Sequence, residues 1–156
     1  ANVTNTAALR VLLAKGDNGA AQFEWSFGPG STDLLTFQVG DQSAAVFPTR
    51  VSDSAITQGS IHMFSAVYTV ALGGGATAMN DVTLYQDAAA IASTANNNAS
   101  YVAMENLTQA LTIGHRAGSQ FFSGIIYLTM MVAGILTAAQ QVSLKRSFNN
   151  YFSLAL

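Results

Sequence analysis

The sequence predicts an all-β fold, an antiparallel sandwich or barrel. Apolar and polar residues alternate from Gln22 to Phe27, with Phe23, Trp25 and Phe27 on one side, which is the period of a half-buried strand. Short apolar runs then follow at close intervals, separated by Gly, Pro, Asn and Asp. A chain of 156 residues is long enough for one such domain and short for two.

The first strands follow one another closely. Ala8 to Ala14 is apolar around one arginine, and Lys15 to Gly19 consists of turn-forming residues, so these segments predict a hairpin with the strand at Gln22 to Phe27. Gly and Pro then interrupt the chain before a strand at Leu34 to Val39. Gly and Asp interrupt it again before a strand at Ala44 to Phe47.

The rest of the chain is expected to complete the sandwich within a single domain, residues 1–156, in which residues 1–7 are a candidate extended arm. Residues 87–99 are rich in Ala and end in an Asn run, which predicts a loop with one helical turn. The remaining apolar runs, separated by Gly, Asn or small residues, predict strands. They are Ile61 to Leu72, Asp81 to Gln86, Tyr101 to Leu107, Phe121 to Ala133, Gln140 to Lys145 and Tyr151 to Leu156.

Charge is scarce in this sequence. Charged residues make up 9% of the chain, against roughly 25% in a typical soluble domain, and the formal net charge is −2. Uncharged polar and small residues replace them, so a surface made of these residues would lose few hydrated ions on contact with another protein. The composition therefore favours a subunit that packs against copies of itself.

The sequence lacks the residues and motifs of nucleic-acid-binding proteins, of common enzyme classes and of metal sites. The six Lys and Arg residues form no cluster beyond Lys145-Arg146, too few for the phosphate contacts of a nucleic-acid-binding protein. No nucleophile elbow, zinc motif or phosphate-binding loop is present. His62 and His115 are interpreted as a hydrogen-bonded core group and a solvated group. We expect no enzyme activity, no metal and no cofactor.

One segment offers a membrane alternative. Ser119 to Gln141 carries no charge over 23 residues, so a helix at 119–141 would make the chain a small membrane-anchored protein. Against this, Gly124 and Gly134 are poor helix residues in water, and Ser and Thr interrupt the apolar run. The preceding β-rich chain also needs closing strands. We therefore expect strands here.

Four segments of the C-terminal half follow one another along the chain: Met63 to Val70, Asp81 to Asp87, Leu136 to Leu144 and Tyr151 to Leu156. Through these segments and their order the C-terminal half, roughly residues 60–156, resembles the jelly-roll family that includes tumour necrosis factor and the globular heads of complement-type collagenous proteins. The usual Gly-Asp before the penultimate strand is Gln140-Gln141 here. The resemblance implies a jelly-roll-type antiparallel sandwich of the ten-strand type that forms trimers about an apolar axis, as in phage and surface head domains.

These features lead us to expect a virion structural protein, such as a capsid decoration or cement protein or a head-fibre subunit. It would form trimers and pack on a major capsid protein or another structural lattice. An alternative is a carbohydrate-binding adhesin or lectin on an extracellular or cell surface, in which Trp25 would stack on a sugar. The candidate interface residues are aromatic, because buried aromatics contribute most to interfaces. They are Phe64, Tyr68, Phe121, Tyr127 and Phe152.

Overall fold

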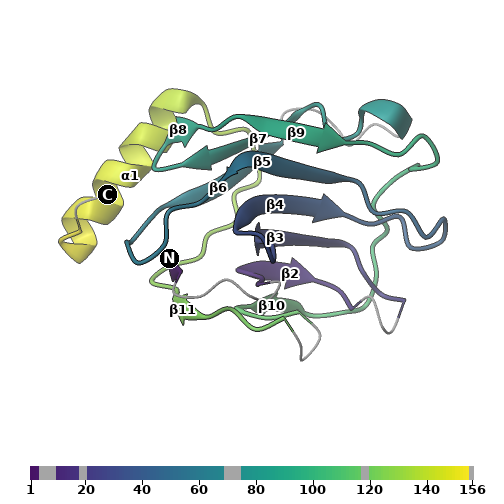
Figure 1. Cartoon of the computed structure of the whole chain (residues 1–156), viewed down its shortest axis with the longest axis horizontal. Coiled ribbons are helices and arrows are strands. Elements are labelled where there is room, and N and C mark those ends of the chain that lie inside the picture. Colours follow the sequence, from purple (N-terminus) through teal and green to yellow (C-terminus); the bar gives the residue numbers. More distant parts are fainter. Residues whose placement is uncertain (4–9, 18–20, 69–74, 117–119, 155–156) are drawn as a thin grey trace.

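The computed structural model describes residues 1–3, 10–17, 21–68, 75–116 and 120–154. Within these ranges the protein is mostly β-structure, with three antiparallel sheets and one α-helix (Figure 1). The expectation of an all-β fold is therefore confirmed.

The largest sheet has six strands in the order β10-β2-β3-β4-β5-β9. The predicted hairpin is present as the antiparallel pair β2-β3, although Ala8 and Leu9 lie outside the described residues. The strand predicted at Leu34 to Val39 has those bounds. The six strands are β2 (Leu13–Lys15), β3 (Trp25–Pro29), β4 (Leu34–Val39), β5 (Thr49–Ala55), β9 (Ser93–Asn96) and β10 (Leu111–Ile113).

Two smaller sheets contain the other strands. One has the order β6-β7-β8, with β6 at Phe64–Tyr68, β7 at Val82–Gln86 and β8 at Ala89–Ala90; a 3-10 turn at Gly75–Thr77 precedes β7. The other pairs β1 (Asn2–Val3) with β11 (Gly124–Ile125).

Asn2 also forms a β-bridge with Ile61, shortly before β6. The chain leading into β6 thus lies beside β1, and β1 lies beside β11. The two small sheets therefore follow one another on the same side of the molecule.

The sheets share one apolar core. Its residues come from all three sheets, so the six-stranded sheet and the small sheets pack against one another. The fully buried members include Val3 of β1, Leu35 and Val39 of β4, and Val82 and Leu84 of β7.

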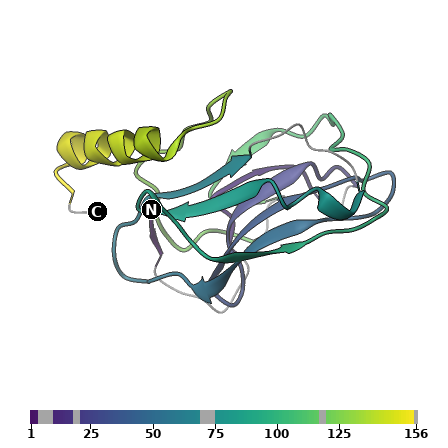
Figure 2. The ribbon, with the colours of Figure 1, turned by 90° about the horizontal axis from the view of Figure 1, so that it is seen from above.

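The strands predicted at Gln140 to Lys145 and at Tyr151 to Leu156 are wrong. Ala138–Phe152 is the helix α1, which runs outward beyond the end of the sheets (Figure 2). Thr137 caps it: its side chain accepts a hydrogen bond from the backbone N–H of Gln140, and the Gln140 side chain accepts one from the backbone N–H of Thr137. This capping box satisfies two N–H groups that the first helical turn leaves free.

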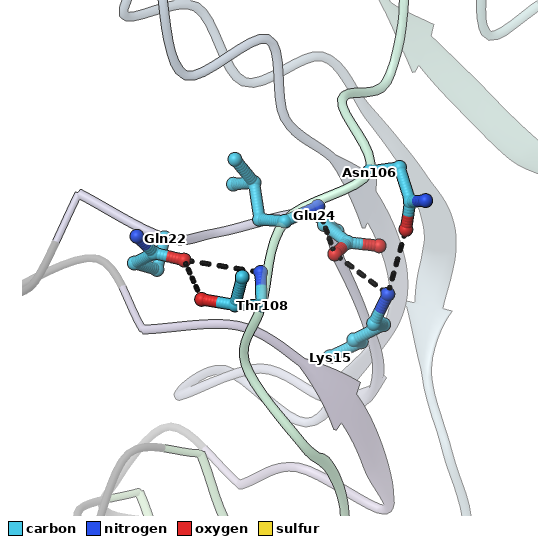
Figure 3. Close-up of polar contacts among 6 residues, drawn as sticks. Lys15, Gln22, Glu24, Asn106 and Thr108 are labelled. Carbon is cyan, nitrogen blue, oxygen red and sulfur yellow. Dashed lines mark hydrogen bonds and ion pairs between the residues drawn. The ribbon is translucent and has the colours of Figure 1, made fainter.

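The predicted strand at Tyr101 to Leu107 is also wrong, since this segment is an irregular loop. Two of its backbone N–H groups, those of Val102 and Leu107, bond to side chains instead of to a neighbouring strand. Leu107 N donates to Glu24 Oε1 at 2.7 Å, and the N and Oγ1 of Thr108 donate to Gln22 Oε1 at 3.3 and 3.2 Å (Figure 3). The loop therefore covers Gln22 and Glu24, the polar residues that alternate with Phe23 and Trp25 at the start of β3.

The loop predicted at residues 87–99 instead contains β8 and β9. Asp87 and Ala88 have φ values of 52° and 67°, and they join β7 to β8 as a two-residue hairpin loop. Positive φ at both positions is the geometry of a type I′ turn, which Asn-Gly or Asp-Gly usually forms. The alanine in the second position hid this hairpin in the sequence.

Two further predictions need correction. Ala44 to Phe47 is not a strand: the chain turns after Asp41, which forms a β-bridge with Val46, and β5 follows unpredicted. Within Phe121 to Ala133 only β11 is a strand, and Gln120 to Thr137 contains no helix. In the described part of the chain, no helix is long and apolar enough to cross a membrane.

Candidate functional site

The strongest candidate for a functional surface is the C-terminal arm, which we define as residues 120–154. It starts beside β1 through the β1-β11 pair, continues without regular structure to Thr137 and ends in α1. From Gln120 to Leu144 it contains no charged residue.

Large apolar side chains of the arm face water. Of the thirteen that are exposed in the described residues, ten belong to this arm. Burial of apolar area is the main favourable contribution to folding and association. These side chains are exposed in a single copy, so burying them against another protein would favour association. They are Phe121, Ile125, Tyr127, Leu128, Met130, Met131, Val132, Ile135, Val142 and Tyr151.

The opposite side of α1 faces the protein. Gln141 is its only fully buried residue, and Leu144, Phe148 and Phe152 are half-buried at helical spacing. Ser65 Oγ of β6 donates a hydrogen bond to Gln141 Oε1 at 3.1 Å. These contacts hold the first turns of the helix against the β6-β7-β8 sheet.

The candidate interface residues fall into two groups. Phe64 and Tyr68 lie on β6, where they are half-buried and pack against the core. Phe121 and Tyr127 are exposed on the arm, by 63% and 40%. Phe152 packs edge to face against Tyr127, with the ring centroids 6.3 Å apart. The structure thus leaves Phe121 and Tyr127 most accessible to another protein.

Several of the scarce charges lie inside the protein, where they are partnered. Arg10 is buried and bonds to Asp33 at 3.2 Å, and Lys15 lies 2.8 Å from the buried Glu24 (Figure 3). Burial lowers the pKa of Arg116, whose guanidinium lies 5.0 Å from the centre of the Phe23 ring. The outer surface is therefore even poorer in charge than the composition indicates.

Asp41 fixes the turn that follows β4. Its carboxylate accepts hydrogen bonds from the backbone N–H groups of Val102 and Ala44 and from Ser43 Oγ, at 2.9, 3.0 and 3.0 Å. The backbone bonds from Val102 and then Ala44 lower the pKa of this carboxyl group. Asp41 therefore ties the loop at 101–110 to the six-stranded sheet.

Among the described residues, the polar pair that most resembles catalytic machinery is His62 with Asp87. His62 Nδ1 lies 2.7 Å from Asp87 Oδ2. Its Nε2 is buried and has no hydrogen-bond partner among the described residues, so no hydroxyl nucleophile is aligned with it there. The described residues also contain no group of three His, Asp or Glu side chains that could bind a metal.

Sequence reasoning missed two of these features. The spacing Thr137-x-x-Gln140 is the capping-box signal and could have located α1. The His62–Asp87 pair joins residues 25 apart, and no local signal predicts it. Trp25, on which the lectin alternative depended, is half-buried, packs against the core and lines a partly open apolar pocket.

No family model, curated protein or solved structure matched this chain. The function is therefore inferred from the chain's own residues and their arrangement.

Proposed function

We propose that this protein is a non-enzymatic structural subunit that assembles with copies of itself through the C-terminal arm. The observation that carries the proposal is the exposure of large apolar side chains along that arm, from Phe121 at 63% to Tyr151 at 82%. A monomeric protein rarely exposes a contiguous apolar patch of more than a few hundred Å².

A second copy is the partner that the charges favour. The arm has no charge between Gln120 and Leu144, so two arms can meet without repulsion and without stripping water from ions. The net charge of −2 adds little repulsion between whole copies. A standard interface buries about 800 Å² per partner, a small part of the 7621 Å² that one copy exposes.

We further propose that the assembly is a trimer with jelly-roll connectivity, and that it is a component of a virion surface, such as a decoration or cement protein on a capsid lattice. Three arms around one axis would cover their apolar residues mutually. The all-β core and the low surface charge support this proposal. The proposed subunit has no catalytic activity, so His62 would have a structural role.

Three single substitutions test the proposed interface. Met131→Lys and Tyr151→Lys place a charge on exposed positions of the arm, where the chain itself loses little packing. Val102→Lys is the matched control, because Val102 is 71% exposed on a loop outside the arm. We expect the two arm variants to lower the mass measured by light scattering and the control to keep that of the unmodified chain. Equal masses for all three variants would exclude the arm as the interface.

A further inference from the structure

Lys15, Glu24 and Asn106 meet beside the six-stranded sheet (Figure 3). Lys15 ends β2, Glu24 directly precedes β3, and Asn106 belongs to the loop at 101–110. Lys15 Nζ lies 2.8 Å from Glu24 Oε1 and donates a hydrogen bond to Asn106 Oδ1 at 3.2 Å. An amine, a carboxyl group and a carboxamide from three separate segments are therefore within hydrogen-bond contact, although the amine and the carboxamide are 91 positions apart in the sequence.

Backbone hydrogen bonds hold these three residues together. The N–H of Leu107, the residue after Asn106, donates to the same Glu24 Oε1 at 2.7 Å. The backbone N–H of Glu24 donates to the carbonyl oxygen of Lys15 at 3.0 Å. Groups that a fold holds in contact react as if at very high concentration, because little freedom is lost when they come together. The three side chains are thus in reach of one another before any reaction begins.

The carboxyl group of this cluster is shielded from water. The side chain of Glu24 is 4% exposed and that of Lys15 is 27% exposed, whereas Asn106 is an exposed residue. Burial disfavours separated charges, and transfer of one proton from the ammonium to the carboxylate removes both charges at once. This transfer, between atoms 2.8 Å apart, gives a neutral amine, which is a nucleophile, and a carboxylic acid, which is a proton donor.

We propose that Lys15 and Asn106 form an isopeptide bond within the chain, with Glu24 as the general acid and base. Cγ of Asn106 is bonded directly to Oδ1, so a rotation of this side chain brings Cγ to Nζ. The lone pair of the neutral Nζ attacks Cγ, and the electrons of the C=O bond move to Oδ1. Glu24 takes a proton from Nζ and gives one to Nδ2. The C=O bond then re-forms, the Cγ–Nδ2 bond breaks, and ammonia leaves.

The isopeptide bond ties β2 covalently to the loop at 101–110. The chain contains no cysteine, so a disulfide cannot make such a link. A cross-link between distant positions restricts the unfolded chain, as a disulfide does, and so favours the folded state. Each chain forms the bond once and acts on no other molecule. The inference is therefore compatible with a non-enzymatic structural subunit and does not depend on the proposed self-assembly.

The test is the mass of the purified full chain, without substitutions, measured by mass spectrometry under denaturing conditions. We expect a mass lower than that of the sequence by one molecule of ammonia. Proteolysis should then release a branched peptide in which Lys15 is joined to Asn106. The full mass of the sequence would overturn the proposal. Loss of ammonia without the branched peptide would also overturn it, because an asparagine alone loses ammonia when it cyclises to a succinimide.

Substitutions then assign the roles. Glu24→Gln keeps an oxygen that can accept from Leu107 N but removes the acid, and Asn106→Ala removes the carboxamide at an exposed position. We expect both variants to have the full mass of their sequences. Glu105→Gln is the matched control, because the Glu105 carboxylate accepts from Ser43 N instead, and this variant should still lose ammonia. The branched peptide in Glu24→Gln would contradict the role of Glu24.

A denaturing gel separates a bond within one chain from a bond between copies. We expect the cross-linked protein to migrate as a single chain of 16.3 kDa. A ladder of covalent oligomers would place the bond between copies and overturn the proposal. Loss of ammonia with the branched peptide, in a chain that is a monomer in native buffer, would support the isopeptide bond even though the proposed self-assembly had failed.

Discussion

Ser65 Oγ and Gln141 Oε1 are joined by a 3.1 Å hydrogen bond that connects β6 to the only fully buried residue of α1. The bond crosses 76 positions of the sequence. It fixes the side of the helix that faces the sheet, and consequently the side that carries Val142 and Tyr151 into water.

Gln141→Ala should loosen the helix from the sheet. Alanine is the best helix former, so the change acts through the lost contact and the unpaired Ser65 and not through helix propensity. We expect the local opening free energy of α1 to fall by about 1 kcal/mol, measured by amide hydrogen exchange. Ser143→Ala, at an exposed position of the same helix, is the control; equal exchange in both variants would show that Gln141 does not anchor α1.

Thr137→Ala should fray the start of the helix. The substitution removes the side chain that accepts from Gln140 N, and loss of such a cap costs about 1 kcal/mol. Thr137→Ser retains the hydroxyl group and should retain the cap. Circular dichroism and hydrogen exchange of residues 138–142 measure the effect, and identical behaviour of Ala and Ser at this position would contradict it.

Asp41 should make the protein sensitive to acid. Its pKa is lower in the folded than in the unfolded state, so its contribution to stability is present above the unfolded value of about 3.9 and is lost as the pH falls through the folded value. We expect Asp41→Asn to lower the free energy of unfolding by about 2 kcal/mol at neutral pH, because hydrogen bonds to a charged group are lost. The variant should also lose less stability than the unmodified chain as the pH falls. Thermal unfolding between pH 2 and pH 7 measures both effects; the same loss of stability at low pH in both proteins would refute the role of Asp41.

Tyr101 should make the protein sensitive to alkali. Burial, with smaller contributions from Tyr68 and Asp41, raises the pKa of Tyr101 to about 12. The unfolded tyrosine ionises near pH 10, so stability falls between pH 10 and 12, by about 2 kcal/mol in total. We expect Tyr101→Phe to remove this loss in thermal unfolding at pH 11. In a 295 nm titration of the unmodified chain, Tyr101 should ionise only near pH 12, and this late absorbance change should be absent from Tyr101→Phe.

Strands with local signals were predictable. Leu34–Val39 and Val82–Gln86 are short apolar runs bounded by turn residues, and both occur as strands, the second starting one residue later than predicted. The β2-β3 pair was also predicted, although Lys15, expected in the turn, ends β2 and Asn18 and Gly19 lie outside the described residues. In these segments local preference and tertiary structure agree.

Segments whose structure depends on distant partners were not predictable in this way. Tyr101 to Leu107 has the composition of a strand, but the side chains of Glu24 and Asp41 accept hydrogen bonds from the backbone N–H groups of Leu107 and Val102. The five aromatic residues were predicted as interface anchors from their type alone. Phe64 and Tyr68 are half-buried against the core on β6, whereas Phe121 is exposed on the arm, and residue type alone does not distinguish these positions.

The central claim is self-assembly, and the mass of the purified chain in detergent-free buffer tests it most directly. Light scattering coupled to size exclusion, with dilution to micromolar concentration, should give a stable mass of three times 16.3 kDa. A mass of 16.3 kDa at every concentration would contradict the proposal that the exposed arm is covered by other copies of this chain.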